Sequence, residues 1–239
     1  MAANQLNPLT GLNNHNGSRL ARSLYAGRVA AWLREAIIEG VLPASEPIIE
    51  MRLAETLQVS RGPIRVALQA LAAEGLVDTL SNGRSVSGGF STADADDLFR
   101  VRYELEATAI TWAIDREADF NPLTVATDAI EADGPTGSAW VELDLNFHQA
   151  LVEASGSRFL TQAWLAIAPV IAAVITVGSK RLTERGSFSN ASRVTESHRA
   201  LYEAVVARNT SEACRLLEEQ FILTESMVLH EPLDESAGA

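Results

Sequence analysis

The sequence has little cysteine and no long run of purely apolar side chains. A single cysteine, Cys214, among 239 residues excludes an internal disulfide and any zinc or iron–sulfur site built from several thiolates. The apolar runs, such as residues 167–177, are shorter than the roughly 20 residues that a membrane-spanning helix needs. The first twenty residues also lack the charged-then-apolar order of a secretory signal peptide. We therefore expect a cytoplasmic protein with no membrane partner.

The composition is that of a globular protein, but its charge is unevenly distributed. Apolar residues make up 47% and charged residues 21%, which excludes a disordered or fibrous chain. The net charge is −12, yet residues 17–90 hold eight arginines and seven acidic residues, so that the remainder carries −13. This asymmetry suggests two domains, of which only the first could approach a polyanion such as nucleic acid. Chance variation along the chain is the alternative explanation.

The first part of the chain predicts short helices followed by a hairpin. Apolar residues at helical spacing predict three helices, at about residues 24–40, 50–57 and 61–74. Ser60 stands at the N-cap position of the third helix, and Pro63 lies in its first turn. The pair Asn82-Gly83 separates two short extended runs, which is typical of a β-hairpin. Three helices and a hairpin in this order are the outline of a winged helix-turn-helix.

Beyond residue 90 the sequence pattern is helical throughout. Six helices are predicted, near residues 91–117, 122–133, 138–154, 158–183, 190–208 and 211–229. The predicted fold class is mainly α, with an N-terminal winged helix-turn-helix followed by an all-helical antiparallel bundle of about six helices. The predicted domains are a flexible tail (1–18), the winged domain (19–90), the helical domain (91–231) and a C-terminal tail (232–239).

Arginines at the start of the third helix are the candidates for contact with DNA. A recognition helix uses its N-terminal residues to reach base edges in the major groove. Arg61 and Arg65 are four residues apart and share one helix face, and the planar guanidinium suits guanine or phosphate. The predicted DNA-binding residues are Arg52, Ser60, Arg61, Pro63, Arg65, Asn82, Gly83 and Arg84. The alternative is that these arginines are ordinary solvated charges.

This region resembles the GntR family of transcriptional regulators. Residues 53–68 are LAETLQVSRGPIRVAL, which is similar to the family signature LAxxLGVSRxPVREAL. The segments IIEG at 37–40 and LAAEGLV at 71–77 also match. Gln58 replaces the usual glycine of the turn, Val66 replaces the usual glutamate, and the wing has NGRSV instead of RGxxV. If Gln58 is left-handed, it costs about 1 kcal/mol relative to glycine.

The helical half resembles the FCD ligand-binding domain of FadR-type regulators. Residues 102–106 (RYELE) are similar to the family's Arg-x-x-Leu-Glu, and residues 144–148 (DLNFH) to its Asp-x-x-Phe-His. A third match is ESH at 196–198, where the family has Glu-His. The resemblance implies a homodimer that binds double-stranded DNA at a pseudo-palindromic operator and a small-molecule effector in the helical domain.

Three side chains of this half are candidate metal ligands. Asp144 and His148 are four residues apart on one predicted helix, so both can point into the bundle and share one cation with His198. The family has a further histidine 22 residues after His198, where this chain has Gln220, a poor ligand for zinc, nickel or manganese. The predicted cofactor is a divalent transition metal of that group, with Gln220 as the argument against it. Alternatively, the two histidines line a ligand cavity as hydrogen-bonded groups, or they are ordinary histidines.

A cavity that takes a carboxylate effector also needs a cation. Arg102 is the candidate for this role, and an ion pair with Glu106, four residues away, is the alternative. Both contacts can coexist. Arg193 and Gln220 complete the set of predicted effector-binding residues. Cys214 is predicted to be an inert, small apolar residue.

The sequence thus predicts a ligand-responsive, DNA-binding transcriptional regulator, which we expect to be a repressor and not an enzyme. One alternative is a DNA-binding dimer whose helical bundle is purely structural, and Gln220 favours it. The other is a metal-dependent hydrolase, but the sequence offers no obvious general base or nucleophile for that chemistry.

Overall fold

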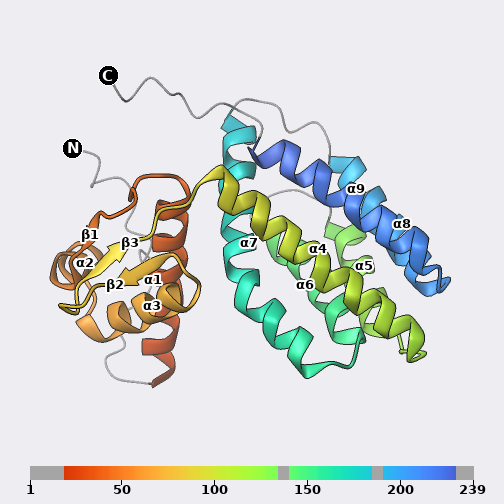
Figure 1. Ribbon diagram of the computed structural model, residues 1–239, viewed down its shortest axis with the longest axis horizontal. Coiled ribbons are helices and arrows are strands. Elements are labelled where there is room, and N and C mark those ends of the chain that lie inside the picture. Colours follow the sequence, from red (N-terminus) through yellow and green to blue (C-terminus); the bar gives the residue numbers. More distant parts are fainter. Residues whose placement is uncertain (1–18, 134–139, 185–190, 230–239) are drawn as a thin grey trace. The chain divides into compact units, whose positions relative to one another are not determined.

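The computed structural model describes residues 19–133, 140–184 and 191–229. It divides the chain into two units, with the boundary between Ser91 and Thr92. The first unit combines helices with a small sheet, and the second consists of helices (Figure 1). The two predicted tails, 1–18 and 232–239, lie outside the described residues.

The first unit is built on three helices, as predicted. They are α1 (Arg19–Ile38), α2 (Glu50–Leu57) and α3 (Arg61–Ala73). Helices α1 and α3 pack against each other through apolar side chains at helical spacing. The buried residues of these two helices include Val29, Leu33, Ile37, Ile64, Leu68 and Leu71. A largely buried ion pair, Arg34 Nη2 to Glu74 Oε1 at 2.7 Å, joins α1 to the end of α3.

The turn between α2 and α3 contains the predicted left-handed residue. Gln58 has φ 54° and ψ 40°, and its backbone N–H donates to the carbonyls of the last turn of α2. Its side-chain amide donates to Glu55 O at 2.7 Å. Ser60 occupies the N-cap position with extended backbone angles, but its hydroxyl makes no capping hydrogen bond. The position of the cap was therefore predicted correctly, while its hydrogen bond was not observed.

A three-stranded sheet forms the wing. Its strands are β1 (Pro47–Ile48), β2 (Val77–Thr79) and β3 (Ser85–Ser87), in the order β1-β3-β2, with both pairs antiparallel. The turn between β2 and β3 places Gly83 at φ 77°, a conformation that glycine adopts without strain. The hairpin was predicted, but β1 was not, because its register with β3 joins positions far apart in the sequence.

The second unit is a bundle of six helices among the described residues, and the predicted fold class is confirmed. They are α4 (Thr92–Asp115), α5 (Asn121–Asp133), α6 (Trp140–Ala154), α7 (Arg158–Glu184), α8 (Ala191–Val206) and α9 (Thr210–Leu229). Helix α4 contacts α6, α7 and α9, while α8 packs against α5 and α9. The buried apolar residues of this unit come from all six of these helices, whose arrangement Figure 1 shows.

Apolar side chains fill the bundle around a small polar region. One buried cluster contains Ile110, Phe147, Leu201 and Phe221, from four different helices. Cys214 is partly buried against this cluster, and burial raises the pKa of its thiol, which agrees with the predicted inert role. Among the described residues of this unit, eight buried polar ones interrupt the apolar interior: Arg102, Glu106, Thr127, Asp144, His148, Ser155, His198 and Gln220.

Helix α7 has a longer apolar segment than expected. The expectation that no apolar segment is long enough to span a membrane was wrong. Residues 158–181 form a helical stretch of 24 residues that contains an 18-residue window with a mean hydropathy of 2.0, enough by length and composition to cross a membrane. The strictly apolar run in the sequence was shorter because threonine, glutamine and glycine interrupt it without adding charge. In this unit, α7 packs against α4, α6 and α9, and its Trp164, Ile171 and Ile175 belong to a buried cluster with residues of α4 and α6.

Candidate metal centre and candidate nucleic-acid interface

Arg61 and Arg65 lie on the outer face of α3, where both side chains are 59% exposed. Ile64 and Leu68, on the opposite face of the same helix, are buried in the core. The four-residue spacing of Arg61 and Arg65 therefore leaves both guanidinium groups in solvent. Both contact Glu50, at the start of α2. Arg61 Nη2 lies 3.0 Å from Glu50 Oε2, and Arg65 Nε lies 2.9 Å from the same oxygen.

Glu50 was not among the predicted site residues, because only the folded turn brings it beside α3. Burial acts to raise its pKa, but the hydrogen bonds and charges of Arg61 and Arg65 outweigh burial and hold the pKa below its ordinary value. Glu50 is therefore ionised at neutral pH. It orders the two arginines and cancels part of their charge.

The other predicted DNA-binding residues divide into exposed ones and one buried one. Arg52 on α2 is exposed, as are Ser60 and the wing residues Asn82, Gly83 and Arg84. Within the wing, the backbone N–H of Arg84 donates to Asn82 Oδ1 at 3.0 Å, which stabilises the turn. Pro63 is instead buried on the inner face of α3, so its prediction as a contact residue is corrected: it packs the helix against the core.

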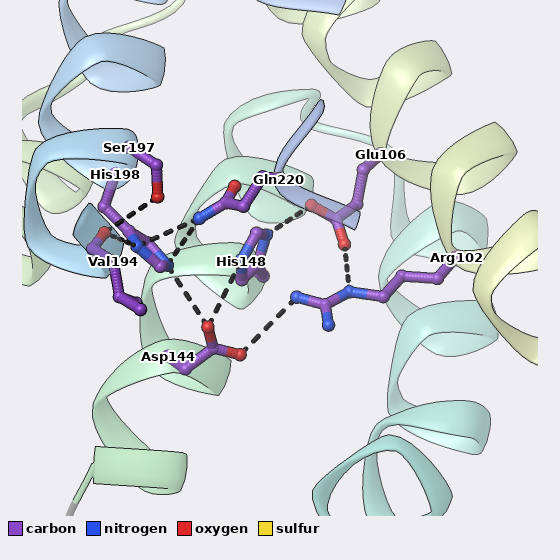
Figure 2. Close-up of polar contacts among 8 residues, drawn as sticks. All are labelled: Arg102, Glu106, Asp144, His148, Val194, Ser197, His198 and Gln220. Atoms are coloured by element: carbon purple, nitrogen blue, oxygen red, sulfur yellow. Dashed lines mark hydrogen bonds and ion pairs between the residues drawn. The ribbon is translucent and has the colours of Figure 1, made fainter. Parts of the chain in front are cut away.

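In the second unit, the three predicted metal ligands lie together. Asp144 and His148 project from α6 and His198 from α8, and all three are buried (Figure 2). Asp144 Oδ1 is 3.2 Å from His198 Nε2 and 3.8 Å from His148 Nε2. One ligand atom from each residue lies within 4.8 Å of the other two. Neighbouring ligand atoms around a metal with bonds of about 2.1 Å are separated by roughly 3.0–3.4 Å, so the contact between Asp144 and His198 has this spacing and the contact between Asp144 and His148 is longer.

Glu106 and Arg102, from α4, border this cluster. His148 Nδ1 lies 2.5 Å from Glu106 Oε2, and Arg102 Nε donates to Glu106 Oε1 at 2.9 Å. Arg102 Nη2 also lies 3.5 Å from Asp144 Oδ2. Figure 2 shows this chain of contacts running from α4 to the aspartate. The predicted pair between Arg102 and Glu106 is thus present, and it leaves Arg102 facing the cluster.

The hydrogen bonds of the two histidines turn their lone pairs toward Asp144. His148 Nδ1 faces the carboxylate of Glu106, which accepts, so that Nδ1 carries the proton and Nε2 is left with a lone pair. His198 Nδ1 faces the carbonyl oxygen of Val194 at 2.8 Å, which fixes the same tautomer. His148 Nε2 has no hydrogen-bond partner among the described residues. Two lone pairs and a carboxylate oxygen that converge in a buried site repel one another unless a cation, or a proton shared between His198 Nε2 and Asp144 Oδ1, lies between them.

The electrostatic environment keeps Asp144 and His148 in the forms that bind metals. Burial, followed by the nearby charge of Arg102, lowers the pKa of His148, which is therefore neutral at pH 7. For Asp144, burial acts to raise the pKa, but His148, His198 and Arg102 outweigh it, and the pKa lies well below its usual range. A neutral imidazole and an ionised carboxylate are the forms that coordinate divalent metals.

The remaining predicted effector residues lie at one side of this cluster. Gln220 on α9 is buried, and its amide nitrogen is 2.9 Å from His198 Nε2. It also lines a pocket of about 560 Å³ between α8 and α9, together with Arg193, Ser197 and Glu219. Arg193 is exposed and is not part of the buried cluster. Of the four predicted effector residues, Arg102, Glu106 and Gln220 therefore lie beside the buried Asp144–His148–His198 cluster, and Arg193 lies outside it.

Trp164 is a candidate that the sequence did not reveal, since it was expected to be a core or interface residue. Its side chain is fully buried on α7, and its ring Nε1 has no hydrogen-bond partner among the described residues. The Arg102 guanidinium carbon lies 5.6 Å from the centre of the Trp164 ring and 4.4 Å from that of Phe221. Two buried donors, Arg102 Nη2 and Trp164 Nε1, thus lack hydrogen-bond acceptors within the described part of the chain.

Comparisons with known proteins identify both halves of the chain. Residues 25–86 match the family described as bacterial regulatory proteins, gntR family, and residues 97–221 match the FCD domain. The gluconate operon transcriptional repressor of Bacillus licheniformis is 24% identical over 84% of this chain and 84% of its own length. The transcriptional repressor GlaR of Escherichia coli is 27% identical over 84% of this chain and 94% of its own.

Solved structures share the fold. McbR/YncC of Escherichia coli superposes with a TM-score of 0.62 at 18% identity, over 85% of this chain and 96% of that one. A structure of Lar from Listeria monocytogenes gives a TM-score of 0.63 at 17% identity, over 85% and 95%. The two sequence relatives, the gluconate operon repressor and GlaR, are both named as transcriptional repressors, and neither is an enzyme. The chain is a transcriptional regulator of the bacterial gntR family, with an FCD domain in its helical half.

Proposed function

We propose that this regulator is a repressor that releases its operator when a small organic acid binds to a metal in the helical unit. The observation that carries the proposal is the convergence of Asp144 Oδ1, His148 Nε2 and His198 Nε2 in a buried site beside Arg102. The effector must bind one arrangement of the DNA-binding units more tightly than another in order to change operator affinity.

For DNA binding, we propose that Arg61 and Arg65 enter the major groove, with Arg52 and the wing residues 82–84 on the backbone. All of these residues are exposed in the first unit. We propose that the protein acts in the cytoplasm as a homodimer, in which each winged unit binds one half of a pseudo-palindromic operator.

Asp144, His148 and His198 would hold zinc, nickel or manganese, since two imidazoles and one carboxylate suit these ions. Such a metal supplies a Lewis-acidic position for an oxygen of the effector. Glu106 would fix the ring of His148, as carboxylates commonly do for metal-bound histidines.

An organic acid fits the groups around this position. Arg102 Nη2, which has only the 3.5 Å ion pair with Asp144 Oδ2, and Trp164 Nε1, which has no hydrogen-bond acceptor among the described residues, can donate to a carboxylate, and a buried charge-assisted hydrogen bond is strong. Relatives named as repressors of a gluconate operon make sugar acids the first compounds to test.

The experiment is a thermal-shift titration of chelator-treated protein with Zn²⁺, Ni²⁺ or Mn²⁺, followed by a panel of sugar and hydroxy acids. We expect a metal to raise the melting temperature of the wild type but not of His198→Ala, and an acid to raise it further only when metal is present. An acid that stabilises both proteins equally without metal would contradict the proposal.

A purely structural bundle is the second candidate function, because Gln220 stands where the family has another histidine. Under that alternative, neither metals nor organic acids shift the melting temperature, while operator binding is unchanged.

A further inference from the structure

The exposed face of α3 carries two neighbouring rows of residues. Arg61 and Arg65 form the first row, and Glu50 holds both guanidinium groups from the start of α2. Gly62 and Val66 form the second row, because residues four apart are neighbours on a helix surface. Both residues of the second row are exposed, Val66 to 55%. An uncharged row therefore lies alongside the charged one.

No packing within the described part of the protein requires a glycine at Gly62. The residue lies in the first turn of α3, and its helical backbone does not need glycine. A Cβ atom at this position would have Ser60 Oγ as its neighbour, at 4.0 Å, which is an ordinary contact distance. Alanine would also favour the helix, since glycine loses more conformational entropy on folding. The missing side chain instead leaves space on the outside of the helix, where a partner can approach the backbone closely.

Val66 adds an apolar wall to this space. A single exposed valine is ordinary on a protein surface, but this one lies one helical turn after Gly62 and next to Arg65. Its branched Cβ strongly prefers one rotamer in a helix, so its methyl groups are held in place before a partner binds. Gly62 and Val66 together form an apolar notch beside the two arginines.

The major groove of DNA presents one apolar group, the 5-methyl group of thymine. Arg61 and Arg65 are the residues that enter this groove in the proposed function, and their guanidinium groups suit guanine. We infer that the apolar notch receives a thymine 5-methyl group next to the base pairs that the arginines contact. Gly62 and Val66 thereby select for thymine in the operator. This inference rests on the entry of α3 into the major groove.

The test uses a DNA duplex that the wild-type protein selects from a library of random sequences. Replacing one thymine at a time by deoxyuridine removes the 5-methyl group and leaves the base pair intact. Fluorescence anisotropy gives the affinity of each duplex for the wild type, Val66→Ala and Gly62→Ala, and thermal melting confirms that each protein is folded. Val125→Ala is the matched control, since Val125 is 63% exposed on α5, in the other unit.

We expect a thymine in each half-site at which deoxyuridine lowers the wild-type affinity about three- to fivefold, the effect of one buried methyl group. Val66→Ala should lose most of this dependence, and Val125→Ala should retain it. Gly62→Ala should melt at a higher temperature than the wild type, because alanine favours the helix. The same variant should bind the selected duplex more weakly, because its Cβ atom fills the notch, and bind unrelated DNA like the wild type.

Three results would overturn the inference and leave DNA binding by α3 standing. The first is a wild-type affinity that no replacement of thymine changes. The second is an equal effect of deoxyuridine on the wild type and on Val66→Ala, which would assign the methyl contact to another residue. The third is an equal loss of affinity for every sequence in the Gly62 and Val66 variants, which would indicate contact with the DNA backbone. A wild-type protein that selects no sequence would refute both the proposed function and this inference.

Discussion

Glu50 is an acidic residue that contacts both exposed arginines of α3, Arg61 and Arg65. Its carboxylate holds both Arg61 and Arg65, so a DNA phosphate that approaches either arginine must replace it. The carboxylate also repels every phosphate, whatever the base sequence. We infer that Glu50 lowers the affinity for all DNA while keeping the two arginines oriented for bases.

Replacing Glu50 with glutamine should therefore increase binding to DNA of unrelated sequence by about three- to tenfold and make its salt dependence steeper. Fluorescence anisotropy at several salt concentrations measures both quantities. Glu55→Gln, on the same helix and exposed, makes the same change of charge without touching the arginines. If the two variants bind DNA equally, Glu50 has no special role.

The pH dependence of this contact follows from the lowered pKa of Glu50. A lowered pKa in the folded state means that the contact contributes stability above the ordinary glutamate pKa of about 4.3. That contribution is lost as the pH falls through the lowered value. The Glu50 contact with the arginines is accordingly complete at neutral pH.

Glu106 provides a second prediction at this scale. Because its carboxylate orients His148, Glu106→Gln should weaken metal binding by roughly 10- to 100-fold. The matched control is Glu104→Gln, an exposed position on the same helix, which should bind metal like the wild type. Chelator competition gives both affinities, and an unchanged Glu106 variant would show that His148 needs no carboxylate partner.

Among the elements, the turn between α2 and α3 carries a measurable strain. Gln58 has a left-handed backbone conformation that glycine adopts more easily. We expect Gln58→Gly to raise the free energy of unfolding of the first unit by about 1 kcal/mol, reduced by the loss of the hydrogen bond to Glu55 O.

Chemical denaturation followed by circular dichroism measures this change. Gln69→Gly is the control, because Gln69 lies within α3 and glycine there should destabilise by about 1 kcal/mol. We expect the free energy of unfolding to rise for Gln58→Gly and to fall for Gln69→Gly. Destabilisation at both would mean that the side-chain hydrogen bond of Gln58 outweighs the backbone strain.

Local sequence patterns predicted most helices and strands. Contacts between residues far apart in the sequence could not be predicted. The helices of both units follow apolar spacing within each segment, and the Asn82-Gly83 turn predicts its own hairpin. Strand β1 could not be predicted, because two residues carry no periodicity and Pro47 pairs with Val86. Its identification requires the folded sheet.

The same distinction applies to the candidate sites. The spacing of Asp144 and His148 on one helix is local, and the family resemblance added His198 and the difference at Gln220. The contact of Glu50 with two arginines of α3, and the buried unpartnered nitrogen of Trp164, arise only from tertiary packing. No sequence signal marked either one.

At the scale of the whole molecule, the two units differ in charge, and thermodynamic linkage relates effector binding to operator binding. The residues that we propose to bind DNA belong to the part of the chain with a small positive balance, while the strongly acidic remainder opposes nonspecific contact with DNA. If an effector weakens operator binding, the operator must weaken effector binding by the same factor. Effector affinity measured with and without operator DNA should therefore change by a factor equal to the change in operator affinity.

Titration with the DNA upstream of the coding region tests the central claim most directly. We would compare the wild type with the Arg61→Ala/Arg65→Ala double variant at several salt concentrations, with unrelated DNA as the control. We predict sequence-selective binding with a steep salt dependence in the wild type, largely lost in the double variant. Equal, weak binding of both proteins to every sequence, with metal and organic acids either present or absent, would contradict this function.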